Sequence, residues 1–398
     1  MILIDHLFDV PLDHDDPGGE RIEVFAREAR APGGEGLPWL VYLQGGPGGR
    51  SPRPLAADGW LARALKTHRV LLLDQRGTGR SAPADLASRD ARYFSRLRAD
   101  AIVRDCEHIR RAMGVERWET LGQSYGGFVT LTYLSMAPEA LKACYVAGGL
   151  PSVSATADDV YARTYPRVLS RTRQFYRRHP ADAERVRAIL DRLSAREVLL
   201  PDGDRLTPHR FRTLGLGLGM GAGFERLHWL IEDGERLSDD FLDQVMRATS
   251  FTANPLFALM QESIYGQGGK PTAWAAERAL ADHPSFAPAA DSLLFTGEMI
   301  YPWMFDEIRS LRPYARAAHE LAAIDDWPPL YDAERLAANR VPVAAVVYHD
   351  DMYVDAGLSL ETAETVGNVR VWVTNEWQHD GLTASGERVL DRLMNLAL

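Results

Sequence analysis

One serine stands in a setting that could make it a nucleophile. Ser124 lies at the centre of Gly122-Gln123-Ser124-Tyr125-Gly126, after the short apolar run 118–121 and before residues 128–136, which have helical apolar spacing. This order predicts a strand, a tight turn and a helix, in which the two glycines let strand and helix approach closely. We therefore expect Ser124 to be exposed at a helix N-terminus, with the backbone N–H of Tyr125 facing a developing oxyanion. The alternative is an ordinary glycine turn without chemistry.

A serine hydroxyl needs a histidine to take its proton and an acid to orient that histidine. In folds with this turn the chain order is serine, then acid, then histidine, and each partner follows a late strand. Asp351 comes after the apolar run 341–348, and His379 comes after the run 369–374. Asp350 is one residue away from Asp351 and stays its rival as the acid. His349 is the rival base, but it would share a loop with the acids, which favours His379.

A glycine-rich loop follows an early buried strand. The run 38–43 is continuously apolar and is followed by Gln44-Gly45-Gly46-Pro47-Gly48-Gly49. Glycines let a backbone approach a substrate closely, so we expect Gly45 to contact substrate and the N–H of Gly46 to face a substrate oxygen. A flexible connector is the alternative.

Composition excludes several classes of protein. The chain has 398 residues, of which 46% are hydrophobic and 25% charged, as in ordinary globular proteins. Its net charge of −10 argues against binding to a nucleic-acid backbone. The two cysteines, Cys106 and Cys144, lie in apolar segments and are expected to be buried free thiols rather than a disulfide or a metal site. Neither a signal peptide nor a run of transmembrane length is visible, so we expect a cytoplasmic protein that does not bind membranes.

Around these residues the chain alternates between strand-like and helix-like segments, which predicts the α/β class. Residues 1–150 give two opening strands, buried strands and a helix over 92–113, a pattern typical of a mostly parallel sheet covered by helices. Residues 151–338 are Arg-rich and helical in spacing, so they are expected to form a helical cap inserted between core strands. Residues 339–398 are expected to add two further strand–helix units to the sheet. Asp74 and Arg76 are expected to pair beside the serine turn, and the alternating glycines from 215 to 223 to serve close packing or a mobile lid.

Three ordered motifs together resemble those of the proline iminopeptidases, serine peptidases of the α/β-hydrolase fold. The family's His-Gly-Gly-Pro-Gly corresponds to residues 44–48, its Asp-Gln-Arg-Gly-x-Gly-x-Ser to 74–81, and its Gly-x-Ser-x-Gly-Gly to 122–127. The resemblance implies that Gly46 and Tyr125 form the oxyanion hole. The family's acid motif, Gly-x-x-Asp, maps onto residues 348–351 and supports Asp351. Two departures stand out: Gln44 replaces the histidine, and the acid motif lacks both its glycine and its later proline.

The resemblance also implies an activity. It points to a serine aminopeptidase that releases N-terminal proline from small peptides through an acyl-enzyme, without metal or organic cofactor. An esterase, lactonase or amidase of the same fold is the alternative. In this family the cap supplies glutamates that bind the free amine, and the candidates here are Glu262 and Glu298, which stand among aromatic and apolar residues. Tyr301 and Trp303 are expected to wall the proline pocket, with Phe305 beside them.

Overall fold

The computed structural model describes residues 1–398 and is built on one eight-stranded sheet, ordered β1-β2-β4-β3-β5-β6-β7-β8. β1 pairs antiparallel with β2, β2 pairs antiparallel with β4, and all other neighbouring strands run parallel. The strands are β1 (Ile2–Pro11), β2 (Arg21–Arg30), β3 (Trp39–Leu43), β4 (Arg69–Leu73), β5 (Trp118–Gln123), β6 (Leu141–Ala147), β7 (Val343–Tyr348) and β8 (Val369–Thr374). The predicted α/β class with a mostly parallel sheet is confirmed.

Helices cover both faces of this sheet because successive strand residues point to opposite sides. Leu40 and Tyr42 of β3 pack with α1 on one face, whereas Val41 and Leu43 pack with α3 and α4 on the other. The first face carries α1 (Gly59–Leu65), α16 (Gly381–Ala384) and α17 (Arg388–Ala397). The second face carries α3 (Ala99–Ala112), α4 (Tyr125–Met136), α14 (Ala333–Ala337) and α15 (Ala356–Thr365). The continuous apolar runs of the central strands are thus buried on both sides.

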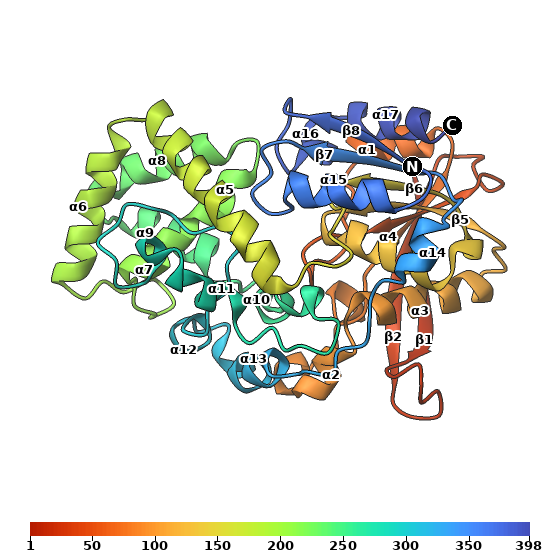
Figure 1. Cartoon of the computed structure of the whole chain (residues 1–398), viewed down its shortest axis with the longest axis horizontal. Helices are drawn as coiled ribbons and strands as arrows, with labels where there is room; N and C mark the ends of the chain where they lie inside the picture. The colour runs from red at the N-terminus through yellow and green to blue at the C-terminus, as the bar shows by residue number, and fades with distance from the viewer.

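A second lobe is inserted between β6 and β7. In Figure 1 its yellow, green and teal helices lie beside the sheet, whereas the red and blue ends of the chain meet in the sheet lobe. It contains α5 (Ala157–Arg178), α6 (Asp182–Ala195), α7 (Pro208–Arg212), α8 (Gly223–Asp233), α9 (Asp239–Thr249), α10 (Pro255–Met260), α11 (Ala275–Arg278), α12 (Met304–Glu307) and α13 (Ala315–Ala322). Its apolar core also takes in Met352 and Tyr353, which follow β7. The cap is therefore packed directly onto a loop of the sheet lobe.

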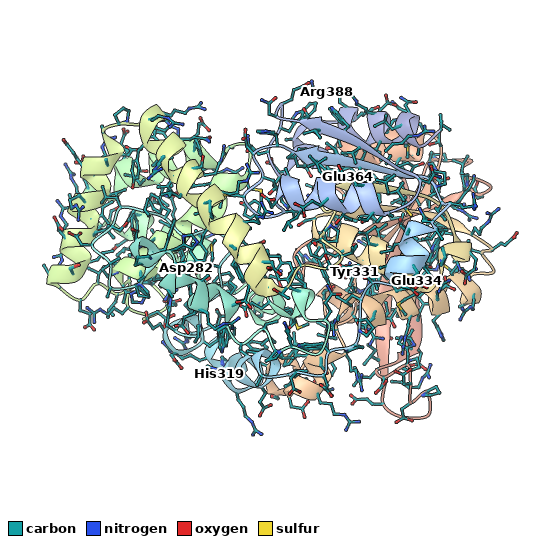
Figure 2. All side chains as sticks on the ribbon, viewed as in Figure 1. Asp282, His319, Tyr331, Glu334, Glu364 and Arg388 are labelled. Atoms are coloured by element: carbon teal, nitrogen blue, oxygen red, sulfur yellow. The ribbon has the colours of Figure 1, made fainter.

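The chain returns from the cap to the sheet lobe before residue 338. Tyr331, labelled in Figure 2, is half-buried at the point of return. The backbone N–H of Asp332 then donates to Oγ of Ser135 in α4 at 3.1 Å, and Asp332 caps α14. α14 packs on α4, so it belongs to the layer that covers the sheet.

The helix predicted over 92–113 is in fact two helices, α2 (Ala91–Ser95) and α3. The single-helix prediction is wrong because residues between them serve other partners. The guanidinium of Arg76 donates a hydrogen bond to the carbonyl of Arg96 at 2.8 Å, and that of the buried Arg98 donates to the carbonyl of Gly266 at 2.6 Å. Only the first of these bonds uses a backbone carbonyl of the segment, and the helical ladder is broken at Arg98, whose ψ of 174° is extended.

The predicted ion pair between Asp74 and Arg76 is also wrong. Asp74 pairs with Arg53 and accepts the backbone N–H of Ser51 at 3.0 Å. Arg76 instead pairs with Asp105 of α3, its Nε lying 2.7 Å from Oδ2, and both side chains are fully buried. Each group is structural, as expected, but its partner comes from a segment that local sequence does not reveal.

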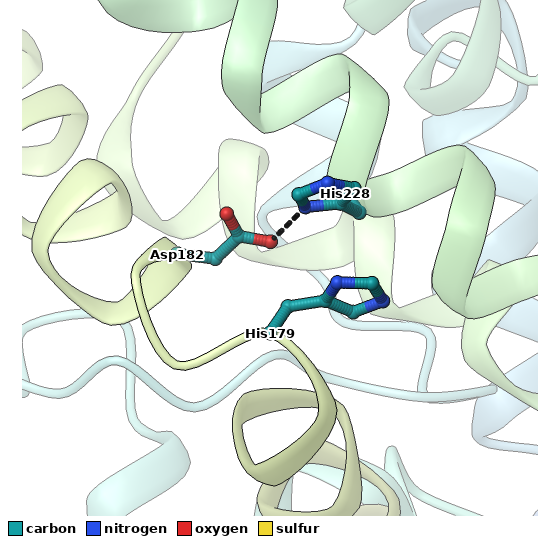
Figure 3. A group of neighbouring side chains, drawn as sticks. All are labelled: His179, Asp182 and His228. Atoms are coloured by element: carbon teal, nitrogen blue, oxygen red, sulfur yellow. Dashed lines mark hydrogen bonds and ion pairs between the residues drawn. The ribbon is translucent and has the colours of Figure 1, made fainter.

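A buried carboxylate joins two helices of the cap, and a histidine at the end of a third lies beside the pair (Figure 3). Oδ2 of Asp182 lies 2.8 Å from Nδ1 of His228 in α8, and its Oδ1 accepts from Arg185 at 2.9 Å. His179, at the end of α5, stacks on His228 with ring centroids 4.1 Å apart and planes inclined by 13°. Imidazole lone pairs lie in the ring planes, so two parallel rings do not converge on a common ion in this arrangement. The Asp182 carboxylate bonds to His228 and Arg185, whereas His179 packs on His228 by ring stacking.

The length and apolar character of the helices decide whether any of them could span a membrane. α5 is the longest at 22 residues, and arginines interrupt its apolar positions. None of the helices combines the length and the apolar character needed to cross a bilayer.

The buried pair of Arg76 and Asp105 predicts a large stability effect. Asp105→Ala should lower the free energy of unfolding by about 3–5 kcal/mol, because it leaves the guanidinium buried without its counter-charge. Asp85→Ala, which removes the exposed partner of Arg89, should cost about 1 kcal/mol or less. Urea unfolding followed by tryptophan fluorescence measures both. Equal losses in the two variants would contradict this account of Arg76.

Candidate active site

Ser124 lies between β5 and α4 in a backbone conformation that few residues adopt. Its φ is +53° and its ψ is −123°, which costs about 1–3 kcal/mol and persists only when the surroundings hold it. A Cβ on Gly126 would lie 1.9 Å from the carbonyl oxygen of Leu43, and a Cβ on Gly122 would lie 2.4 Å from that of Gly126. Glycine is therefore required at both positions, as the sequence pattern predicts. Tyr125 is the first residue of α4, so its N–H has no partner within the helix.

The structure brings Asp351 and His379 together. Nδ1 of His379 lies 2.7 Å from Oδ2 of Asp351, and both side chains are buried. The other carboxylate oxygen, Oδ1, accepts the backbone N–H groups of Tyr353 and Val354 at 2.8 and 3.1 Å. The backbone bonds orient the carboxylate, and its contact with Nδ1 fixes the imidazole tautomer that leaves Nε2 free to accept a proton.

The two rival residues lie elsewhere. Nδ1 of His349 is 3.0 Å from Oδ1 of Asp350, and their side chains are 64% and 38% exposed. They pair with each other at the surface, although each is within two residues of Asp351. The one-residue difference between Asp350 and Asp351 thus decides which carboxylate faces the interior.

The charge on His379 is set by opposing effects. Burial alone would lower its pKa, but the adjacent Asp351 outweighs burial, and Glu298 and Asp380 add to it. The net result is a pKa raised above the ordinary value for histidine. An imidazolium formed during a reaction is therefore stabilised at this position.

Ser124 and His379 line one open cavity of about 240 Å³ at the boundary of the two lobes. The glycine loop of the sheet lobe and apolar and acidic side chains of the cap form its walls. Its lining residues are Gln44, Gly45, Gly46, Gln123, Ser124, Leu216, Met220, Phe257, Glu298, Tyr353 and His379. The residues predicted for nucleophile, base and oxyanion loop therefore share one space.

The glycine loop is held close to the nucleophile. A Cβ on Gly45 would lie 2.9 Å from Cβ of Ser124, and Gly46 has a φ of +119°, in the region that favours glycine. The loop is anchored on two sides, because Nε2 of Gln75 donates to the carbonyl of Gln44 and Nδ2 of Asn254 donates to that of Pro47, each at 3.2 Å.

Glu298 is the one acid in the cavity. It is half-buried, and its surroundings raise its pKa to about 8, mainly through burial, with Asp351 adding to the effect and His379 opposing it. The carboxyl group is therefore close to evenly divided between its neutral and charged forms near pH 8. A cationic ligand in the cavity would shift it to the carboxylate.

Glu262 does not line the cavity. It is buried, and its two carboxylate oxygens accept the backbone N–H groups of Ala275 and Ala276 at 3.0 and 2.9 Å. Burial raises its pKa to about 7, and these two bonds oppose the rise. The geometry gives Glu262 a structural task at the start of α11.

Tyr301 and Trp303 lie in the cap rather than among the cavity-lining residues. The hydroxyl of Tyr301 is 2.9 Å from that of Tyr165, and Trp303 stacks on Tyr301 with ring centroids 6.2 Å apart. Phe305 is buried in the same apolar core.

Sequence reasoning missed most of the cavity wall. Leu216, Met220 and Phe257 reach the cavity from the cap, and Tyr353 reaches it from the loop after β7. One signal in the sequence was the alternation of glycines from 215 to 223, because repeated glycines indicate that a segment packs closely against a neighbouring one. Another was the position of Tyr353, two residues after the acid.

Comparisons with known proteins extend over nearly the whole chain. The family model for the alpha/beta hydrolase fold matches residues 38–382. A proline iminopeptidase of Aeromonas sobria is 46% identical over 98% of this chain and 95% of its own length. The proline iminopeptidase aneH of Aspergillus aculeatus is 34% identical over 98% of this chain and 92% of its own length. Both alignments include the cap as well as the sheet lobe.

The contrast between the two neighbouring acids gives a sharp prediction. Asp351→Asn should slow the inactivation of Ser124 by a fluorophosphonate by on the order of 10³-fold or more, because the amide fixes the wrong imidazole tautomer. Asp350→Asn, with the same chemical change one residue away, should stay within about twofold of wild type, because Asp350 pairs with His349 at the surface and does not bond to His379. Inactivation rate constants measure both. A slower reaction in Asp350→Asn than in Asp351→Asn would reverse the assignment of the acid.

Proposed function

The chain belongs to the proline iminopeptidase family of α/β-hydrolases, as its motifs predict, and we propose that it is a serine aminopeptidase that releases N-terminal proline from peptides. The reaction passes through an acyl-enzyme. The expected substrate is a small peptide with a free N-terminal proline.

In the first half-reaction Oγ of Ser124 attacks the prolyl carbonyl carbon while Nε2 of His379 takes the hydroxyl proton. Asp351 holds the imidazole and stabilises the imidazolium. The carbonyl oxygen becomes an oxyanion facing the N–H groups of Gly46 and Tyr125, where donors aimed in advance lower the barrier. His379 then gives its proton to the leaving peptide amine, and the C–N bond breaks to leave a prolyl ester on Ser124.

In the second half-reaction His379 removes a proton from water, and the water oxygen attacks the ester carbonyl. The same two N–H groups face the second oxyanion. Collapse of this intermediate releases proline, and His379 returns the proton to Oγ of Ser124.

The observation that carries this proposal is the position of Glu298. An aminopeptidase must recognise a charged amine beside the scissile carbonyl, and a carboxylate that shares a cavity with the nucleophile meets this requirement. Burial disfavours the charged form of Glu298, and a substrate ammonium would supply the positive charge that stabilises it.

The apolar cavity wall supports a proline side chain. Leu216, Met220, Phe257 and Tyr353 surround the space next to Ser124 with hydrocarbon and aromatic surface. A pyrrolidine ring has no polar side-chain atoms, so this surface can bury it without leaving a hydrogen-bonding group unpaired. The cavity of about 240 Å³ is below the range for drug-sized ligands and suits a single residue.

The esterase, lactonase or amidase alternative is not favoured. An acyl group without an amine would form no ion pair with the cavity carboxyl group of Glu298. The relatives from Aeromonas sobria and Aspergillus aculeatus, each aligned over 98% of the chain, are named proline iminopeptidases.

We also propose a cytoplasmic location. Cys106 and Cys144 are buried free thiols, which suits a reducing compartment. Burial raises the pKa of both thiols, with Cys144 at about 12, so neither is poised to react.

Glu298→Gln tests amine recognition. The variant should lower kcat/KM for a prolyl anilide by about 10- to 100-fold, the effect of losing a hydrogen bond to a charged group. Hydrolysis of a nitrophenyl ester without an amine should change little. Glu262→Gln is the matched control. It should lower the melting temperature, since its oxygens hold α11, and should change kcat/KM for the prolyl anilide less than Glu298→Gln does. A larger loss of prolyl anilide cleavage in Glu262→Gln would reassign the anchor.

The pH dependence provides a second measurement on the same variants. Glu298 has a pKa of about 8, so its carboxylate forms as the pH rises toward 8. The ratio of kcat/KM for the prolyl anilide to that for the ester should rise over this range in wild type, because dividing by the ester value cancels the ionisation of His379. In Glu298→Gln this rise should be absent. A rise that persists in the variant would assign the ionisation to another group.

A further inference from the structure

The peptide groups around His379 are held from both lobes. The backbone N–H of His379 donates to the carbonyl of Gly219 in the cap at 3.2 Å. Its own carbonyl accepts from Nε2 of Gln123, the residue before the nucleophile, at 3.1 Å. The next residue, Asp380, accepts the N–H of Gly221 at 2.9 Å. Both Gly219 and Gly221 belong to cap residues 213–223, which we call the glycine segment.

The glycine segment is held in turn by an arginine of α5. Nη2 of Arg171 donates to the carbonyl of Leu218 at 2.7 Å, and its Nε lies 3.3 Å from the same oxygen. The side chain is 7% exposed and lies over the ring of Phe224, and burial lowers its pKa. Its remaining hydrogen-bond partner is Oε1 of Gln174 at 3.1 Å. Its two hydrogen-bond acceptors are neutral, and the charges of Asp350 and Asp351 offset only part of the cost of burying the cation, so its contact with Leu218 requires an explanation.

Tyr353 links the glycine segment to the side chain of His379. Its ring packs edge-on against the imidazole with centroids 4.7 Å apart, and its hydroxyl donates to the carbonyl of Leu216. Its backbone N–H donates to Asp351. A Cβ on Gly219 would lie 2.3 Å from the Tyr353 ring, so only glycine permits this contact.

From these contacts we propose that the glycine segment positions His379, with Arg171 and Tyr353 as positioning residues. The cap is then needed for proton transfer on any acyl substrate, in addition to its part in binding the amine. This inference rests on the proposed serine mechanism but not on the identity of the substrate.

The segment is poorly suited to act as a lid. Opening the cap here would break the bonds to His379, Asp380 and Tyr353 together, and it would expose the Arg171 contact. The base would lose its backbone anchor at the moment of opening. The prediction of either close packing or a mobile lid is thus resolved in favour of close packing at Gly215, Gly219 and Gly223, where a Cβ would lie 2.0–2.3 Å from a neighbouring atom. Nothing in the structure explains Gly217, which faces open space.

The test compares Arg171→Met with Arg173→Met. Arg173 lies on the same helix but is exposed, so its variant controls for the loss of an arginine from α5. We expect Arg171→Met to lower three quantities by a common factor of about ten: kcat for a prolyl anilide, kcat for a nitrophenyl ester, and the inactivation rate by a fluorophosphonate. KM should stay within about twofold, Arg173→Met should match wild type, and Arg171→Lys should recover part of the loss by donating to Leu218.

The proposal would be overturned if Arg171→Met reacted with the fluorophosphonate at the wild-type rate and only raised KM for the prolyl anilide. In that case the segment shapes the substrate site alone. If Arg171→Met does not fold, Tyr353→Phe decides the question, because it keeps the ring and removes only the bond to Leu216; an unchanged inactivation rate would then reject the proposal. If the wild type fails to cleave the prolyl anilide, the proposed function is wrong. The inactivation rates would still test whether the glycine segment positions His379.

Discussion

The backbone of Ser124 is strained, and this single turn constrains much of the surrounding structure. A φ of +53° at a residue with a side chain is kept only when neighbouring atoms leave no alternative. Those neighbours are backbone atoms of β3 and α4, which approach so closely that Gly122 and Gly126 have no room for a Cβ. The parallel order of β3, β5 and β6 is what brings these segments to one edge of the sheet. The strain is thus supported by the fold as a whole, and it fixes where every partner of Ser124 must lie.

A second constraint is electrostatic. One imidazole lies near three carboxyl groups, those of Asp351, Glu298 and Asp380. Asp351 accepts two backbone N–H groups and contacts Nδ1 of His379, whereas burial raises the pKa of Glu298 to about 8. Neighbouring acids in different surroundings are suited to different tasks. Asp351 is suited to hold the imidazolium, and Glu298 is suited to receive a cation from outside.

The sequence predicted those parts of the site that depend on chain order. Ser124, Asp351 and His379 each follow a strand of a parallel sheet, and the carboxyl ends of such strands meet at one edge. Residues from the cap could not be placed in this way, because their positions depend on packing between helices distant in sequence. Glu262 and Glu298 look alike in sequence, but backbone N–H groups of Ala275 and Ala276 bind the first, whereas the second lines the cavity. The partner of Arg76 was missed for the same reason, since Asp105 lies on another element.

The place of the insertion explains how the cap can serve both binding and chemistry. The cap leaves the sheet after β6 and returns before β7. In the sheet these two strands lie between β5, which ends at the Ser124 turn, and β8, which precedes His379. Any segment inserted there begins and ends beside the catalytic edge. Its two ends are therefore fixed by the sheet, and the chain between them can return to the site at more than one point. Here it returns with the glycine segment against His379 and with Phe257 and Glu298 in the cavity. A cap attached at either terminus of the chain would lack this double anchoring, so the long gap between Ser124 and Asp351 is a physical requirement of the arrangement rather than an accident of length.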